Sequence, residues 1–193
     1  MRWNSGCWGR ASEVLTAVLL FAALIVLGLV ALIRIRRRRV VPLRDEAGAI
    51  IPGSISERVF VETGGIRQGM FIQSANPQNH DLLFLHGGPG MPEYFMVDGY
   101  PTGLERDFTM VWGEQRGVGM SFSSDILPDN MTVTQMIADT VEVADYLRAR
   151  FGKEKIILLR HWWGSCLGIQ VTAKAPGHFH FYDYYSRSLD TKI

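Results

Sequence analysis

The stretch DLLFLHGGPG, residues 81–90, decides the fold class of this chain. Its first half is a short and almost continuously apolar run, as expected of a strand that is buried on both faces of a sheet. Three glycines follow within five residues and allow the backbone to turn sharply directly after that strand. Two further runs, FTMVW at 108–112 and KIILL at 155–159, predict two more buried strands.

A hairpin is predicted before these strands. Arg58–Thr63 and Ile66–Ser74 read as extended runs on either side of the pair Gly64-Gly65, which is a short-range hairpin signal.

A helix is predicted between the second and third buried runs. Apolar residues recur at helical spacing from Val133 to Phe151. Thr132 and Gln135 predict a capping box at its start, and Gly152 is suited to its end. A hairpin followed by strands that alternate with helices indicates an α/β sheet, on which ligand chemistry gathers at the carboxyl ends of the strands.

Each buried run ends in a loop that contains glycine. The sequences are HGGPG at 86–90, GEQRGVGMS at 113–121 and RHWWGSCLG at 160–168. The first is suited to present backbone N–H groups to an oxyanion, and in the second an ion pair between Glu114 and Arg116 would hold the loop. The third has the glycines of a tight strand-to-helix turn. Taken singly, the first loop is more simply a tight turn, and the second is equally compatible with a surface turn.

In this order and spacing, the three loops resemble the proline-iminopeptidase-like branch of the α/β-hydrolases. That branch carries H-G-G-P-G, then D-Q-R-G-x-G-x-S, then G-H-S-W-G-S/G. Residues 86–90 match the first motif, and residues 114–121 match the second with Glu in place of Asp. The third is matched at His161, Trp163 and Gly164. The resemblance covers roughly residues 56–176 and implies the N-terminal half of an α/β-hydrolase sheet.

The resemblance also implies roles for individual residues. The backbone N–H of Trp163 and one from Gly87 or Gly88 would form an oxyanion hole. The side chains expected to support the loops are those of His86, Glu114 and Arg116.

The nucleophile position departs from the family pattern. The attacking serine would stand at position 162, where this chain has Trp162, and the first elbow position holds Arg160 instead of glycine. An indole has no nucleophilic atom. The nearby Ser121, Ser165 and Cys166 are expected not to replace the serine, so no catalytic residue is expected to be intact.

The remaining catalytic groups are also expected to be missing. In the family the acid and the histidine follow the serine, on loops after later strands. The 31 residues after Trp162 include His178, His180, Asp183 and Asp190, but no strand–helix unit is predicted before them. Nothing is expected to cover the far edge of the strand at 155–159.

The N-terminal region predicts a membrane anchor. Residues 14–33 carry no charge, and 20 residues are about the number that a helix needs to cross the hydrocarbon core. Five arginines, Arg34 and residues 36–39, stand where a peptidase would cut a signal peptide, so an uncleaved single-pass helix is expected. A buried core helix is the alternative. The arginine bias predicts a cytoplasmic position for the C-terminal side.

These features divide the chain into four parts. They are a transmembrane anchor with a basic flank at 1–39, a linker at 40–56, a partial hydrolase domain at 57–176 and a divergent tail at 177–193.

Charge and composition exclude several functions. Residues 1–44 carry a formal charge of +7 and the remaining residues −6, whereas a nucleic-acid binder needs its basic surface on the folded domain. Cys7 and Cys166 are too unlike in setting to predict a disulfide framework, and the five histidines lack a ligand spacing. These patterns predict no metal site and no nucleic-acid partner. The apolar N-terminal segment predicts a lipid bilayer as partner, and the family resemblance implies a small acyl or peptide substrate and no cofactor.

Three hypotheses about the function remain. The chain is a member of a membrane-anchored lineage of serine hydrolases that cleave peptide, amide or ester bonds, and is inactive as written. Alternatively, it is a pseudoenzyme that serves as a tethered binding module, or a truncated gene product without a function of its own.

Overall fold

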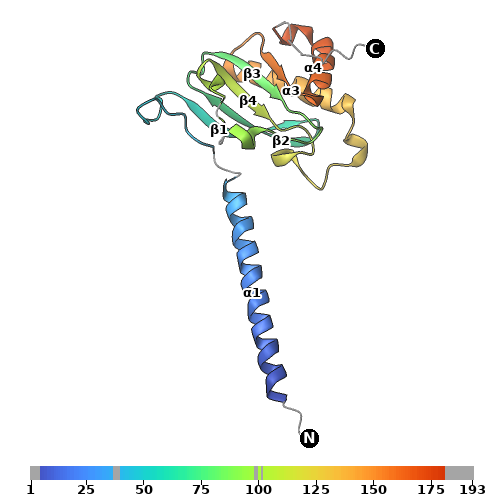
Figure 1. Cartoon of the computed structure of the whole chain (residues 1–193). Helices are drawn as coiled ribbons and strands as arrows, with labels where there is room; N and C mark the ends of the chain where they lie inside the picture. Colours follow the sequence, from blue (N-terminus) through green and yellow to red (C-terminus); the bar gives the residue numbers. More distant parts are fainter. Residues whose placement is uncertain (1–4, 37–39, 98–99, 101, 181–193) are drawn as a thin grey trace, which may run out of the picture. The chain divides into compact units, whose positions relative to one another are not determined.

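The computed structural model describes residues 5–36, 40–97, 100 and 102–180, and within the first range it describes the side chains of residues 13–32. The chain divides into two compact units at Arg39 and Val40. The first unit consists of helix α1, Ser5–Arg36 (Figure 1). Its segment Glu13–Leu32 is long and apolar enough to cross a membrane, a property that signal sequences and core helices of soluble proteins share.

The second unit is built on a mixed sheet of five strands in the order β1-β2-β4-β3-β5 (Figure 1). The strands β1 (Ile55–Thr63) and β2 (Ile66–Ser74) form an antiparallel hairpin, and β4 (Phe108–Gly113) pairs antiparallel with β2. On the other side β4 pairs parallel with β3 (His80–Leu85), which pairs parallel with β5 (Ile157–Arg160). The α/β class, the hairpin and the three strands predicted from apolar runs are therefore confirmed.

Four strands differ in their bounds from the prediction, and for β3 and β4 the difference is a single residue at one end. β1 begins at Ile55 instead of Arg58, because its pairing extends to Ser74 at the end of β2. β5 starts two residues later than the run KIILL and ends one residue later, because its pairing with β3 extends from Ile157 to Arg160.

Ile156 pairs on the outer side of the sheet, away from β3. It forms a parallel bridge with Phe179, in which the Ile156 N–H donates to the carbonyl of His178 at 2.9 Å. The His180 N–H in turn donates to the Ile156 carbonyl at 3.0 Å. The expectation that nothing covers this edge is therefore wrong at Ile156.

Helices α3 (Val133–Phe151) and α4 (Trp163–Lys174) follow β4 and β5, respectively. Thr132 caps α3 by accepting the Gln135 N–H at 3.1 Å, and Gly152 ends the helix in the left-handed conformation, as predicted. The shorter helices are α2 (Tyr94–Val97), η1 (Leu104–Arg106), η2 (Gly119–Ser121), η3 (Pro128–Asn130) and η4 (Pro176–His178).

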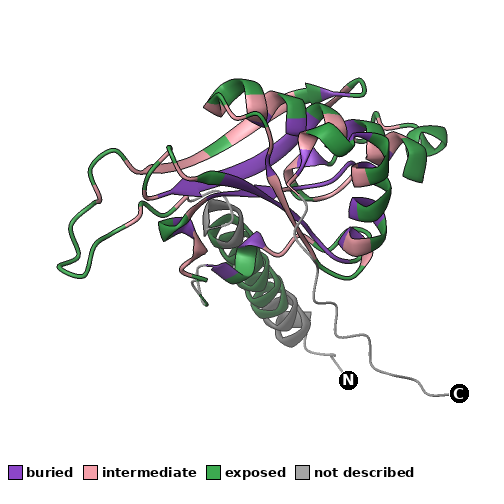
Figure 2. Cartoon of the chain, turned by 90° about the horizontal axis from the view of Figure 1, so that it is seen from above, coloured by how far each residue is buried: buried purple, intermediate pink, exposed green. Residues whose placement is uncertain are grey.

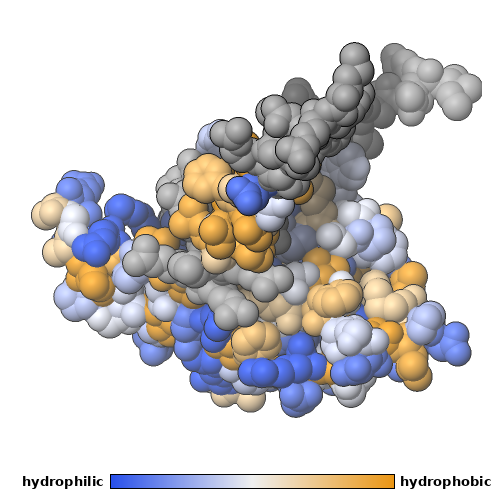
Figure 3. Space-filling view, turned by 90° about the horizontal axis from the view of Figure 1, so that it is seen from below, coloured by the Kyte–Doolittle hydropathy of each residue, from blue (hydrophilic) through white to orange (hydrophobic). Residues whose placement is uncertain are grey.

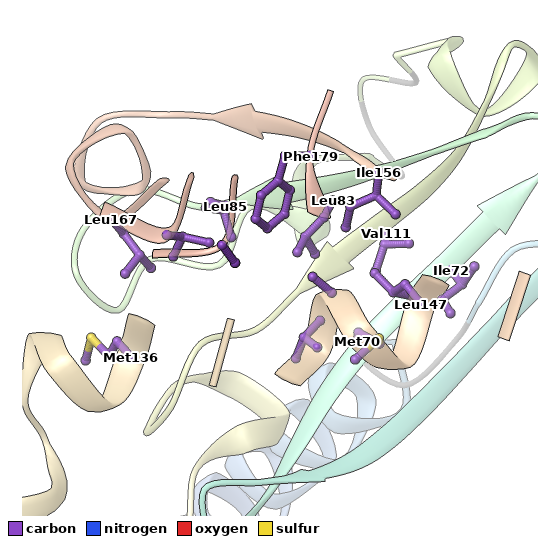
Figure 4. Packing of buried hydrophobic residues seen from close by; sticks show 14 residues of the cluster. Met70, Ile72, Leu83, Leu85, Val111, Met136, Leu147, Ile156, Leu167 and Phe179 are labelled. Atoms are coloured by element: carbon purple, nitrogen blue, oxygen red, sulfur yellow. The ribbon is translucent and has the colours of Figure 1, made fainter. Parts of the chain in front are cut away.

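The sheet has a hydrophobic cluster on each face, and its central strands are buried (Figure 2). Alternation along β3 sends Leu83 and Leu85 to one face, where they pack with Leu147 of α3 and Leu167 of α4 (Figure 4). The other cluster comprises Phe71, Leu82, Phe84, Tyr94, Val97, Met110 and Trp112. Both faces of β3 and β4 are therefore covered, which explains their continuous apolar runs.

The surface mixes polar and apolar side chains, as Figure 3 shows for one face of the molecule. Several large apolar side chains are exposed in the segments that follow β3, β4 and β5, namely those of Met91, Phe95 in α2, Phe122, Leu127 and Trp162.

Candidate active site

The turn between β5 and α4 has an uncommon backbone. Trp162 lies there with φ 48° and ψ −112°, and it is the one non-glycine residue with positive φ among those described. Bulky residues rarely adopt this conformation, which here reverses the chain within a single residue. The Trp162 side chain is 77% exposed and stands at the apex of the turn, as predicted for the position of the nucleophile.

Gly164 allows α4 to start against the end of β3. A Cβ atom on Gly164 would lie 2.0 Å from the carbonyl oxygen of Leu85, which is far inside van der Waals contact. The absence of this side chain therefore sets the distance between the third loop and the first.

We expect Gly164→Ala to lower the free energy of unfolding by at least about 2 kcal/mol, because the backbone of β3 or α4 must move to relieve the overlap. Gly177→Ala is the matched control, since a Cβ atom there meets no atom within 4 Å. Chemical denaturation of the full chain in detergent micelles measures both. Equal stability of the two variants would contradict this account of the turn.

His86 joins the first and second loops. It is buried, its Nδ1 lies 2.9 Å from the Gly87 carbonyl, and its Nε2 accepts the Gln115 N–H at 3.1 Å. Burial lowers the pKa of His86, against the raising effects of the Gly87 carbonyl and the Glu93 charge. A neutral ring that donates from Nδ1 and accepts at Nε2 fits both contacts.

Gln115 extends this network to the third loop. Its side-chain N–H donates to the His86 carbonyl at 3.2 Å, and its Oε1 accepts the Trp163 indole N–H at 3.1 Å. The structure thus brings the three loops together at one edge of the sheet. His86 supports the glycine loop, whereas the connecting role of Gln115 has no signal in the sequence beyond its place in the second motif.

The predicted ion pair between Glu114 and Arg116 is wrong. Arg116 is buried and forms a bidentate pair with Asp139 of α3, with both N–O distances at 2.8 Å. The Arg116 guanidinium also donates to the Gly64 carbonyl at 2.9 Å, so it ties the second loop to the hairpin turn. Glu114 instead accepts the backbone N–H of Met120.

The second loop is also held by Ser121, as expected of a hydrogen-bonding support. Its hydroxyl donates to the Glu114 carbonyl and accepts the Gly69 N–H at 2.9 Å. With both contacts made and the side chain buried, Ser121 lies outside the solvent-exposed part of the site.

The residues predicted for the oxyanion hole lie close together. A Cβ atom on Gly87 would be 3.4 Å from the Trp162 Cβ, which places the glycine loop beside the elbow. The Gly87 N–H points to Glu93 Oε1 at 3.4 Å. Within the described part of the chain, no acceptor is recorded for the backbone N–H groups of Gly88 and Trp163.

Glu93 and His161 form a contact at the site that the sequence did not reveal. His161 Nδ1 lies 2.6 Å from Glu93 Oε1, and the two residues come from different loops. The Glu93 carboxyl is mostly buried, whereas about half of the His161 ring is exposed. A separation of 68 residues leaves no local pattern from which this pair could be predicted.

Other residues weighed as catalytic groups lie away from the elbow apex or outside the described range. Ser165 and Cys166 belong to the first turn of α4, and the Cys166 residue is exposed. His178 pairs with Asp145 of α3 at 2.9 Å, and His180 contacts His80 at a ring distance of 5.6 Å. Both histidines flank the bridge at Ile156, at the opposite end of β5 from Trp162. Asp183 and Asp190 lie outside the described residues.

The part of the chain that the structure describes contains no group of three or more His, Cys, Asp or Glu side chains suited to a metal ion.

Sequence comparison finds relatives among bacterial peptidases. The body is 42% identical over 129 residues to the probable aminopeptidase YbaC of Bacillus subtilis, covering 67% of this chain and 41% of the relative. It is 30% identical over 118 residues to the proline iminopeptidase of Neisseria gonorrhoeae, covering 61% and 36%. No protein-family model matches the chain. The chain thus spans about two fifths of the length of these relatives.

Solved structures show the same fold. The proline iminopeptidase-related protein of Thermus thermophilus superposes with a TM-score of 0.51 at 30% identity, covering 64% of this chain and 42% of that protein. The 2-hydroxy-6-oxo-6-phenylhexa-2,4-dienoate hydrolase of a Rhodococcus species superposes with a TM-score of 0.53 at 22% identity, which supports the fold alone. Together with the three loop motifs at one sheet edge, these matches identify the chain as a proline-iminopeptidase-like α/β-hydrolase that spans part of the length of its relatives.

Proposed function

We propose that this chain is a membrane-anchored member of a serine-hydrolase lineage acting on peptide, amide or ester bonds, and that as written it does not hydrolyse them itself. The observation that carries the proposal is Trp162 at the apex of the turn between β5 and α4. The loops keep the arrangement that presents backbone N–H groups to an oxyanion, while the attacking atom is replaced by an indole.

Serine-type acyl transfer requires oxyanion donors, a nucleophile and a general base, and this site supplies the first of these. Donors for the developing oxyanion are available in the backbone N–H groups of Gly88 and Trp163. A nucleophile and a general base hydrogen-bonded to it are also needed. The indole of Trp162 supplies no nucleophile, and His161 already faces the Glu93 carboxylate through Nδ1. We therefore assign oxyanion binding to the site, without the covalent step.

The activity test uses the full chain in detergent micelles with p-nitrophenyl acetate. We expect no saturable turnover above that of the Trp162→Ala variant, because neither protein has a hydroxyl or thiol at the apex. Saturable turnover that is lost in Ser165→Ala would overturn the proposal, since it would show that a residue of α4 acts as nucleophile. The proline iminopeptidase of Neisseria gonorrhoeae serves as the active reference.

Membrane anchoring is part of the same proposal. The segment Glu13–Leu32 is supported as a span by its length and its apolar composition. The arginines that follow it favour retention of the hydrolase-like domain in the cytoplasm. The lipid bilayer is then a constant partner, and any substrate-like ligand is a small acyl or peptide compound.

We expect the full chain to stay in the membrane pellet after a wash at pH 11, because about 20 apolar residues hold it in the hydrocarbon core. A variant with Leu19→Arg and Ile25→Arg is the control, since two charges in the span are costly there. Recovery of the intact, unaltered chain in the soluble fraction would contradict the anchor.

The site favours the hypothesis of a ligand-binding pseudoenzyme over that of a gene product without function. The contacts of His86, Gln115 and Arg116 keep the three loops joined although the nucleophile is absent. Ligand binding by such a module is tested with acetate and short peptides as probes, by the change in tryptophan fluorescence that the full chain shows and the Trp162→Phe variant does not.

A further inference from the structure

The outer edge of β1 is an open edge of the sheet. β1 is the outermost strand on its side and runs for nine residues without a proline (Figure 1). It forms backbone hydrogen bonds with β2 and with no other segment that the structure describes. The outer side of such a strand presents backbone groups that can pair with a further strand.

The hydrogen bonds of β2 show which residues of β1 point outward. Gly69 of β2 lies opposite Phe60, and both of its backbone groups are bonded on the side away from β1. The Gly69 N–H donates to the Ser121 hydroxyl at 2.9 Å, and the Gly69 carbonyl accepts the Glu114 N–H at 3.0 Å. Bonded and non-bonded positions alternate along an antiparallel pair. The backbone groups of Phe60, and of alternate residues on either side of it, therefore face the outer edge.

The outward-facing residues carry opposite charges at matched positions. Arg58 and Glu62 stand two residues before and two residues after Phe60, and both are exposed. Neither forms an ion pair with another described residue. The Phe60 ring leans toward β2, since a Cβ atom on Gly69 would lie 3.2 Å from its Cε1 and the Arg67 guanidinium lies 4.1 Å from its centroid. The edge is thus open around Phe60 and charged on either side.

We propose that a second copy of this chain pairs with this edge through its own β1, antiparallel, around a two-fold axis at Phe60. Phe60 then lies opposite Phe60 of the second copy, and the two residues exchange both backbone hydrogen bonds. Arg58 lies opposite Glu62 of the second copy. Because the two-fold axis repeats every contact, the two copies gain two such ion pairs. This pairing does not depend on the proposed function.

Charge selects this register over its neighbours. An axis at Arg58 or at Glu62 would place like charges directly opposite each other, which is unfavourable. An axis at Val59 or at Val61 would leave both charges without an opposite charge across the interface. Among these positions, the axis at Phe60 alone gives both charges a partner. The edge is therefore complementary to itself, which favours a second copy over an unrelated strand as its partner.

The first test is charge reversal in the full chain in detergent micelles, with the dimer dissociation constant measured by analytical ultracentrifugation. We expect Arg58→Glu and Glu62→Arg each to raise this constant at least about tenfold, because each makes two attractive pairs repulsive. The double variant restores opposite charges between the copies, and we expect a constant within about threefold of that of the natural sequence. The two positions are about 13 Å apart along one strand, so a contact within one copy cannot produce this recovery.

Glu154→Arg is the matched control. It makes the same change of charge just before β5, at the other edge of the sheet, and we expect it to leave the dissociation constant unchanged. A natural chain that stays monomeric would overturn the proposal and would show that the edge charges keep copies apart. Single variants without effect, a double variant as weak as either single one, or an equal loss in the control would also overturn it.

A mixture of two single-cysteine proteins tests the register directly. Cys7 and Cys166 are first replaced by serine, after which one protein carries Arg58→Cys and the other Glu62→Cys. We expect disulfides between unlike proteins in at least about tenfold higher yield than between like proteins, because like positions lie at least about 13 Å apart across the interface. Mass spectrometry of the dimers without reductant measures the yields. Equal yields, links mainly between like proteins, or no links at all would overturn the pairing.

Discussion

Replacing Asp139 with alanine is expected to lower the free energy of unfolding by about 3–5 kcal/mol. The change leaves the Arg116 guanidinium buried without its carboxylate, and an uncompensated buried charge is among the most costly defects in a protein. Asp139 accepts two hydrogen bonds from Arg116 at 2.8 Å and a third from the Gln135 side chain. The loss also releases the second loop from α3.

The matched control is Asp145→Ala on the same helix. Asp145 pairs with Arg148 and His178 but is half-exposed, so we expect a loss of at most about 1 kcal/mol. Guanidinium denaturation of the full chain in micelles measures both variants. Similar losses in the two would show that the pair between Arg116 and Asp139 does not hold the loop in place.

The second large effect concerns pH and Asp81, at the start of β3. Burial raises the pKa of Asp81 from 3.8 to about 7, although the charge of Lys153 opposes the shift. Neither carboxyl oxygen has a hydrogen-bond partner among the described residues. The folded state therefore keeps this proton to a higher pH than the unfolded state does. Its contribution to stability is complete below about pH 4 and is lost as the pH rises through 7.

A shift of about 3 pH units corresponds to roughly 4 kcal/mol. We therefore expect the stability of Asp81→Asn, relative to the natural sequence, to improve by about 4 kcal/mol between pH 4 and pH 8, because the amide cannot ionise. Asp129→Asn removes an exposed carboxyl and is the control, for which the pH dependence of the natural sequence should persist. A pH-independent difference between Asp81→Asn and the natural sequence would contradict the assignment.

The fold was largely predictable because its signals are local. A glycine pair between extended runs, apolar runs of five residues and a Thr132 cap each act over a few positions, and the structure confirms all three. The expected capping box is only half formed, since the Gln135 side chain turns to Asp139 instead of returning to the Thr132 N–H. A long-range polar contact prevailed there over a local one.

Only the part of the site that is formed by the three loop motifs could be predicted from the sequence. The order of the three loops placed them at one edge of the sheet, and the structure puts them there. The pairs Arg116–Asp139 and His161–Glu93 join residues 23 and 68 positions apart, and such pairs have no periodicity. The first of these pairs does have a signal in the sequence, because Asp139 lies three positions after Met136 on the buried side of α3, where a carboxylate requires a partner.

The most direct test of the central claim is labelling of the full chain with a fluorophosphonate probe, read as intact mass after desalting. Such probes attach covalently to a hydroxyl that an enzyme has activated for attack on an electrophilic centre. Because Trp162 stands at the apex of the elbow, we predict no mass increase under conditions that label an active serine hydrolase completely. A stoichiometric adduct on any serine of the chain would contradict the account and show that the site retains a working nucleophile.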